Sequence, residues 1–186
     1  HPHFLFNALN TVYFQIDESN KAPRRTLEMI SELLRYQLYG GNQKVSILQE
    51  IDYLKTYIAL RKLRMSERLR LRVEFPPELN ELNIYPLLFL PLVENAFKYV
   101  GGDYQLDIIM KWENNRISLF IRNSIPELSA EDEALRKSVD ERQRKGIGLV
   151  NLRRRLSLLY PNKHRLETRK EETEFVAELM IEIEEI

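Results

Sequence analysis

The chain has 186 residues, which is enough for one ordinary domain or for one domain with a helical appendage. Hydrophobic residues make up 44% of it, and Lys plus Arg equal Asp plus Glu at 28 each. We therefore expect a real core and no nucleic-acid partner, because a balanced chain lacks the electrostatic attraction that drives such binding. Cysteine is absent, which excludes disulfides, thiol nucleophiles and Cys-ligated zinc.

Residues 1–65 are expected to be all-helical. Apolar residues recur at helical spacing over 2–16, and Pro2 suits a first helical position. A polar turn at 17–23 precedes a second helix that ends at Gly40-Gly41-Asn42. A third helix runs to about residue 64, opened by Ser46 with Gln49 three residues later, the pattern of a capping box.

The pattern after residue 66 predicts strands with a few helices. Alternating residues predict strands over 69–75, 105–111, 116–122, 164–170 and 174–183. Helices are expected around Glu94-Asn95 and over 146–160, with a charged loop between about 127 and 145. This half is therefore an α+β unit: an antiparallel sheet with helices packed on one face.

The stretch 90–99 reads as an apolar helix that ends in a polar cluster. Glu94 and Lys98 are four residues apart, as are Asn95 and Tyr99, so these groups share one edge. Leu87, together with Leu88, Leu92, Val93 and Ala96, is left to face a core. An amide, a carboxylate and a lysine on a rigid element suit a metal–phosphate site. A buried helix that frays into polar residues has the same pattern.

Two further segments could carry chemistry. His3 falls in the first turn of a helix, and a neutral imidazole is a competent phosphoryl acceptor. The alternative is a surface or capping histidine; a metal pair with His1 lacks a third ligand at suitable spacing. Gly146 and Gly148 open the later helix, where unpaired N–H groups favour phosphate, although an ordinary turn explains them equally well.

Three motifs, in order, resemble the LytS/YehU-type sensor histidine kinases. PHFLFNALN at 2–10 resembles their phosphoacceptor box, LVENAFKY at 92–99 the N box of their ATP-binding domain, and GIGLVNL at 146–152 their second glycine box. The resemblance covers nearly the whole chain. It implies a helical dimerisation and phosphoacceptor region over 1–65 and a GHKL-type α/β sandwich, with an antiparallel-rich sheet, over 66–186.

The resemblance also implies roles for single residues. His3 would be autophosphorylated, since it precedes Phe-Leu-Phe-Asn, whereas His1 stands where the family usually has a polar residue. Asn95 would coordinate the Mg²⁺ that bridges the ATP phosphates. Glu94 occupies the position of the water-activating base of related GHKL ATPases, and in a kinase it would support metal binding or proton transfer.

The nucleotide would touch further residues of these motifs. Lys98 and Tyr99 would lie along the phosphates or the ribose. A lid over 125–145 would close on the triphosphate. The remaining contacts implied by the second glycine box come from Lys145, Gly146, Gly148 and Leu149.

One departure from the family concerns the adenine. The family's first glycine box supplies Asp-x-Gly, whose carboxylate accepts a hydrogen bond from the adenine amino group. Asn123 stands at the aspartate position here, and Ser124 to Pro126 contain no glycine. A neutral acceptor makes a weaker bond, by roughly 1 kcal/mol, which is about fivefold in affinity. The lid hinge should also be stiffer.

The sequence thus leaves three readings of the function. The first is a two-component kinase that is a homodimer and passes phosphate to a response regulator, of the LytTR type by resemblance. The second is a pseudokinase, a nucleotide-responsive or purely structural signalling module with weak or no ATP binding because Asp-x-Gly is missing. The third is a hydrolytic ATPase, which would leave the His3 box without a purpose.

A membrane location is expected only through other parts of the protein. No apolar run reaches the roughly 18 residues that span a bilayer, and the first residue is His rather than Met. We expect this to be the cytoplasmic piece of a longer inner-membrane protein, cut before His1. Its sensor would lie upstream.

Overall fold

The computed structural model describes residues 2–39, 43–77, 79, 82–127 and 147–183. The chain divides into two compact units. One is His1–Met65 with Asn83–Leu87, and the other is Ser66–Leu82 with Leu88–Ile186. The short segment 83–87, which lies between parts of the second unit in the sequence, thus belongs to the first, the helical unit.

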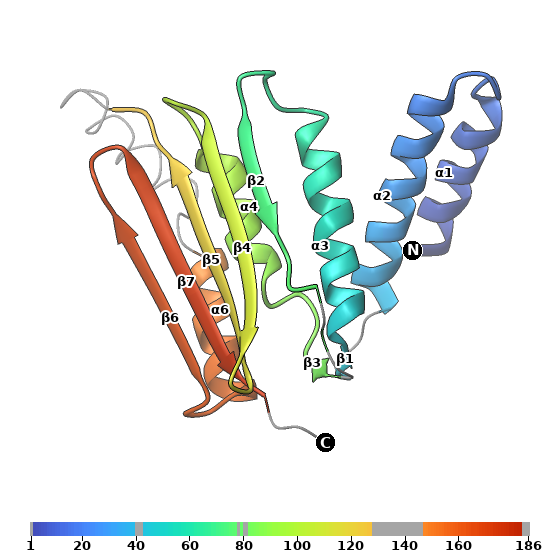
Figure 1. The fold of residues 1–186 in the computed structure, drawn as a ribbon. Helices are drawn as coiled ribbons and strands as arrows, with labels where there is room; N and C mark the ends of the chain where they lie inside the picture. Colours follow the sequence, from blue (N-terminus) through green and yellow to red (C-terminus); the bar gives the residue numbers. More distant parts are fainter. Residues whose placement is uncertain (1, 40–42, 78, 80–81, 128–146, 184–186) are drawn as a thin grey trace. The chain divides into compact units, whose positions relative to one another are not determined.

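Three helices build the helical unit: α1 (Pro2–Gln15), α2 (Lys21–Tyr39) and α3 (Ile47–Lys62). α1 packs on α2, and α2 packs on α3 (Figure 1). The capping box predicted at the start of α3 is present: the Ser46 hydroxyl accepts from the Leu48 N–H, and the Gln49 side chain accepts from the Ser46 N–H. Local signals therefore placed this helix correctly.

Two details of this unit differ from the sequence-based expectation. α2 begins at Lys21, so the expected turn at 17–23 is too long. Pro23 suggested a loop, but proline is tolerated in a first helical turn, where its missing N–H has no helical partner. The unit is also not all-helical, because β1 (Val45–Ser46) pairs antiparallel with β3 (Asn83–Ile84).

A five-stranded sheet in the order β2-β4-β5-β7-β6 forms the second unit. Its strands are β2 (Arg70–Glu74), β4 (Gln105–Glu113), β5 (Arg116–Ser124), β6 (His164–Lys170) and β7 (Glu174–Glu182). The hairpin between β4 and β5 turns on Asn114 and Asn115, whose φ values of 51° and 59° suit a two-residue turn.

The β2–β4 pair is parallel, whereas the sequence suggested an antiparallel sheet throughout. The chain leaves β2, passes through α4 (Leu90–Tyr99) and returns as β4. A helical crossover of this kind brings the second strand back in the same direction. The other three pairs of the sheet are antiparallel, so the expected antiparallel-rich sandwich is confirmed.

Helices α4 and α6 (Ile147–Leu159) cover one face of the sheet (Figure 1). α4 packs on β4 and β5, and α6 packs on α4 and β6. α4 spans the expected stretch 90–99. Leu87, which was expected to face the core with this helix, lies before it with a φ of 58°, a conformation that helices do not contain. Between helices and sheet lies the core, made largely of Leu92, Val93, Phe97, Leu106, Ile108, Ile121, Leu152 and Leu156.

The turn that follows α4 lies tightly against the end of β5. Gly102 has a φ of 61°, and a Cβ placed there would lie 3.0 Å from the Ile125 carbonyl oxygen. We expect Gly102→Ala to lower the free energy of unfolding by about 1–2 kcal/mol, because a side chain disfavours this conformation.

Gly148→Ala is the matched control for this variant. A Cβ at Gly148 meets no atom within 4 Å, and the residue lies in α6. Alanine should therefore raise the free energy of unfolding by about 0.5–1 kcal/mol. Urea titrations of both variants measure the two effects, and a shift of the same sign in both would contradict this account.

Candidate functional site

The polar edge of α4 lies at the border between core and solvent. Val93 and Ala96 are buried in the core. Glu94 and Lys98 are exposed, whereas Asn95 and Tyr99 are half-buried. The Lys98 ammonium lies 4.9 Å from the centre of the Tyr99 ring. α4 is thus an amphipathic core helix whose partly exposed side carries an amide, a carboxylate and an ammonium.

Asn123 lies near the end of β5, on the sheet face that the helices cover. It pairs with Leu106 of β4 and follows the buried Ile121 by two residues, so its side chain is on the core side. It is only 1% exposed, and its amide nitrogen donates to the Ser124 carbonyl at 3.3 Å. Its buried Oδ1 has no hydrogen-bond partner among the described residues.

An unpartnered buried amide oxygen costs about 1–3 kcal/mol. A ligand with an N–H group would remove that cost. Because α4 packs on both β5 and α6, the sandwich brings the α4 edge, Asn123 and the first turn of α6 into one unit.

The start of α6 offers room for a ligand. Gly148 and Leu149 lie in its first turn, and the backbone at Gly148 is exposed with open space where a Cβ would stand. The first N–H groups of a helix have no helical partner and favour an anion. Lys145 and Gly146, together with the lid beyond residue 127, lie outside the described residues.

His3 is in the other unit, in the first turn of α1. His1 lies outside the described residues. Within the part of the chain that the structure describes, no three His, Cys, Asp or Glu side chains are grouped to hold a metal. A Mg²⁺ ion at Asn95 would therefore depend on ligands that the nucleotide and water bring.

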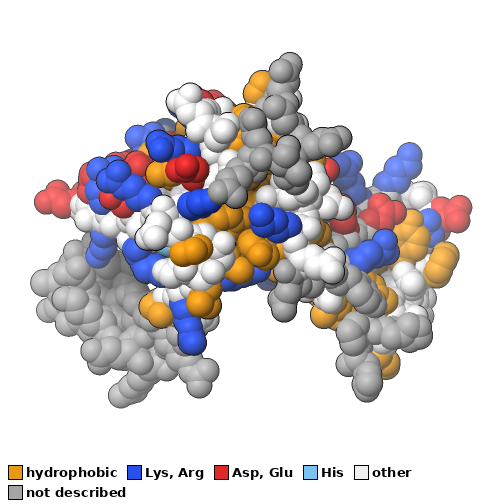
Figure 2. All heavy atoms as spheres, turned by 90° about the horizontal axis from the view of Figure 1, so that it is seen from below, with side chains coloured by type: hydrophobic (Ala, Val, Ile, Leu, Met, Phe, Trp, Pro, Cys, Tyr) orange, Lys and Arg blue, Asp and Glu red, His pale blue; other side chains and the backbone are white. Residues whose placement is uncertain are grey.

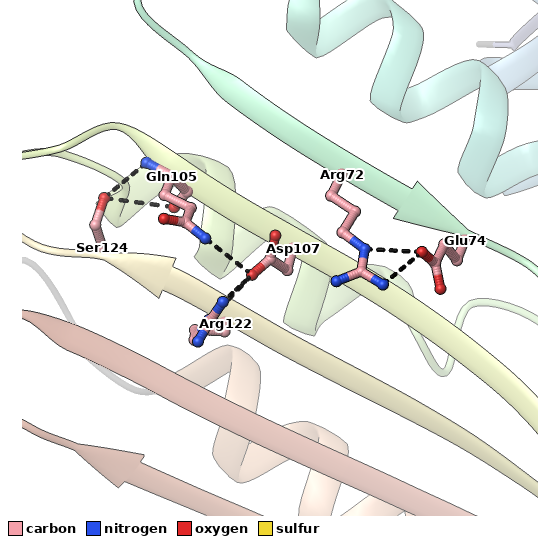
Figure 3. Close-up of polar contacts among 6 residues, drawn as sticks. All are labelled: Arg72, Glu74, Gln105, Asp107, Arg122 and Ser124. Atoms are coloured by element: carbon pink, nitrogen blue, oxygen red, sulfur yellow. Dashed lines mark hydrogen bonds and ion pairs between the residues drawn. The ribbon is translucent and has the colours of Figure 1, made fainter.

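Two polar networks were not predicted from the sequence. On the uncovered face of the sheet, the buried Asp107 accepts from Arg122 through Nη2 at 2.6 Å and Nε at 3.0 Å (Figure 3). This contact raises the pKa of the Arg122 guanidinium. In the helical unit, the fully buried Glu50 accepts from the Tyr36 hydroxyl and the Leu87 N–H. Both networks join residues far apart in sequence.

Comparison with known proteins finds histidine kinases. Residues 1–69 match the family model described as Histidine kinase. The sensor protein kinase HptS of Staphylococcus aureus is 29% identical over 170 residues, which cover 89% of this chain. The chain is thus similar to histidine kinases, through the family model over residues 1–69 and through HptS over most of its length. The resemblance drawn from the three motifs is thereby confirmed.

Solved structures of histidine kinases agree in fold with this chain. The histidine kinase domain of the Erythrobacter litoralis blue-light activated histidine kinase EL346 matches with a TM-score of 0.52 and 14% identity, over 94% of this chain and 93% of that domain. Full-length ShkA in complex with AMPPNP matches with a TM-score of 0.52 and 14% identity, over 98% of this chain and 44% of that one. The expected fold class is confirmed.

The chain is short beside the curated relatives that it matches. It spans 33% of the length of HptS. Among its described helices, none combines the length and the apolar character that crossing a bilayer requires.

Basic and acidic side chains of the described residues are interspersed over the face shown in Figure 2, without one large area of a single sign.

Proposed function

We propose that this chain is the kinase portion of a two-component sensor histidine kinase. In this proposal residues 1–65 form the dimerisation and phosphoacceptor region, and residues 66–186 bind ATP with Mg²⁺. The bound ATP phosphorylates His3, and the phosphoryl group then passes to an aspartate of a response regulator. The family model matched by residues 1–69 and the similarity to the sensor protein kinase HptS support a histidine kinase of the sensor type.

The observation that carries the proposal is the buried, unpartnered Oδ1 of Asn123. An acceptor at this position suits the amino group of adenine, which is a good donor. It also lies in the same unit as the α4 edge and the open start of α6. Full-length ShkA, which is similar in fold, is described in complex with AMPPNP, an adenine nucleotide.

The phosphates would lie between α4 and the start of α6. Asn95 would supply one oxygen ligand to Mg²⁺, which when bound neutralises phosphate charge. Lys98 would pair with the phosphates, Tyr99 would lie beside the phosphates or the ribose, and the backbone at Gly148 and Leu149 would donate N–H groups. Glu94 would orient water on the metal or take a proton. Lys145 and Gly146, just before α6, would also contact the phosphates.

The transfer itself needs mainly positioning. The lone pair of an unprotonated His3 nitrogen forms the new N–P bond. The bond between the γ phosphorus and the β–γ bridging oxygen breaks, and ADP leaves with that electron pair. The proton on the other ring nitrogen then goes to a base.

A homodimer is part of the proposal. α1 exposes large apolar side chains, with Phe4 75% and Phe14 78% exposed and Leu5 and Val12 more than a third exposed. If a second copy covers this surface, apolar area is removed from water, which stabilises a dimer. The response regulator would be of the LytTR type. The chain would be the cytoplasmic part of a membrane-anchored kinase.

Titration calorimetry with ADP and Mg²⁺ tests the nucleotide site. We expect micromolar binding, and we expect Asn95→Ala to weaken it on the order of tenfold or more because the metal loses a protein ligand. Asn10→Ala, an exposed asparagine of α1, is the control and should bind like the parent chain. No binding at millimolar nucleotide would instead favour a pseudokinase, the alternative suggested by Ser124 to Pro126 in place of Asp-x-Gly.

A further inference from the structure

Asn123 has two ends that recognise opposite chemistry. Its amide oxygen accepts hydrogen bonds and its amide nitrogen donates them, so the orientation of the side chain decides which base edge it can bind. An aspartate has no such choice, because both of its oxygens accept. The orientation of Asn123 is therefore a determinant that the family's usual aspartate does not need.

The Ser124 carbonyl fixes this orientation. Asn123 Nδ2 donates to it at 3.3 Å. If the amide turned over, Oδ1 would face that carbonyl oxygen, and two acceptors would oppose each other. The Ser124 carbonyl is itself held, because it also accepts from the Gly101 N–H at 3.0 Å.

The Ser124 hydroxyl lies on the opposite face of the sheet from the Asn123 side chain and also bonds to the chain between α4 and β4. It donates to the Gly101 carbonyl at 2.7 Å and accepts from the Gln105 N–H at 2.9 Å (Figure 3 shows the contact with Gln105). Ser124 thus ties the turn between α4 and β4 to the end of β5. A Cβ at Gly101 would lie 2.9 Å from the Pro126 ring, so this turn and the chain after Ser124 also lie in close contact.

We propose that Ser124 is a positioning residue that holds the amide of Asn123 with its oxygen toward the ligand, so that the site selects a purine with an amino group at carbon 6 over one with a carbonyl there. This rests on the proposed nucleotide site. Ser124 does not touch the base. It acts through Asn123.

The discrimination follows from hydrogen-bond pairing. An amino group donates to Oδ1 and satisfies it. A carbonyl at carbon 6 would leave two buried acceptors facing each other, and sites built for a hydrogen bond reject analogues that lack the donor. Because the bond is between neutral groups, we expect ADP to bind about tenfold more tightly than inosine diphosphate.

Competition titrations with ADP and inosine diphosphate, both with Mg²⁺, test the proposal on the full chain. We expect Ser124→Ala to reduce the tenfold preference to about threefold or less, with the affinity for inosine diphosphate unchanged or slightly raised. Ser118→Ala removes a hydroxyl from the same strand and the same face, and should keep the full preference. Thermal unfolding confirms that the variants are folded at the assay temperature.

A double variant separates positioning from a general structural effect. Asn123→Ala should remove the preference, and Ser124→Ala should change nothing further in that background. Equal binding of ADP and inosine diphosphate by the parent chain would overturn the proposal while leaving the nucleotide site intact, as would an unchanged preference in Ser124→Ala. If the parent chain binds neither nucleotide, the nucleotide site and this proposal both fall.

Discussion

His3→Gln is expected to abolish labelling of the chain by γ-³²P-ATP, with a loss of at least two orders of magnitude in rate. Glutamine keeps the length and polarity of the position but has no ring nitrogen with an available lone pair. The measurement is acid-labile, base-stable phosphate on the protein after incubation with ATP and Mg²⁺. ADP binding should be unaffected, because His3 belongs to the helical unit and the nucleotide residues to the other.

His1→Gln is the matched control, since it makes the same change two residues earlier. We expect it to retain labelling, which would distinguish the two histidines of the opening segment. Full labelling of His3→Gln would show that the phosphoacceptor is another residue of the chain. Loss of labelling in both variants, with ADP binding intact, would show that the segment is needed for a reason other than the His3 ring.

Glu50→Ala is expected to destabilise the helical unit by about 3–5 kcal/mol. The Glu50 carboxylate is fully buried, and its Oε2 accepts from the Tyr36 hydroxyl at 2.7 Å and from the Leu87 N–H at 2.9 Å. Alanine would leave both donors unsatisfied and open a cavity. Urea unfolding, followed by circular dichroism, measures the loss.

Asp52→Ala provides the control for Glu50. Asp52 is a carboxylate on the same helix, but its side chain is 71% exposed and lies 4.0 Å from Lys55. Its removal should cost less than about 0.5 kcal/mol. A loss below 1 kcal/mol for Glu50→Ala would mean that the network is not a source of stability.

The same network has a pH dependence with a definite sign. Burial, and then the Glu50 carboxylate, raise the pKa of Tyr36 above its ordinary value. A group whose folded pKa is raised contributes stability that is fully present below its unfolded pKa, about 10 for tyrosine, and lost as the pH rises above it. The hydrogen bond to Glu50 should therefore persist through the neutral range.

Helices α1, α2 and α3 were predictable because their signals are local. Apolar spacing and the Ser46 cap are contained in single segments, and the Asn114-Asn115 turn likewise specified its own hairpin. The parallel β2–β4 pair was not predictable in this way, because residues 70–74 show alternation but not the direction of their partner. Helix α4 was placed correctly by its apolar face, while Leu87 was wrongly counted among the residues of that face.

The candidate site was predictable only in its residue types. The motifs gave Asn95, Gly148 and Asn123, but the unpartnered oxygen of Asn123 depends on the burial of β5, which lies between β4 and β7 and packs on α4. Ser124 carried no signal, since a serine at a strand end is common. Its importance comes from the hydrogen bonds that link it to Gly101 and Gln105, about twenty residues earlier, and no sequence spacing predicts them.

Segment 83–87 bears on how the chain can be divided. Residues on both sides of it belong to the sheet unit, yet Ile84 is fully buried in the helical unit and pairs with Val45. A fragment starting at residue 66 would keep this strand and lose its partner, exposing an apolar edge that invites aggregation. The two units are thus interleaved in sequence, and a biochemist who wants the ATP-binding half alone must replace 83–87 with a polar linker as well as remove residues 1–65.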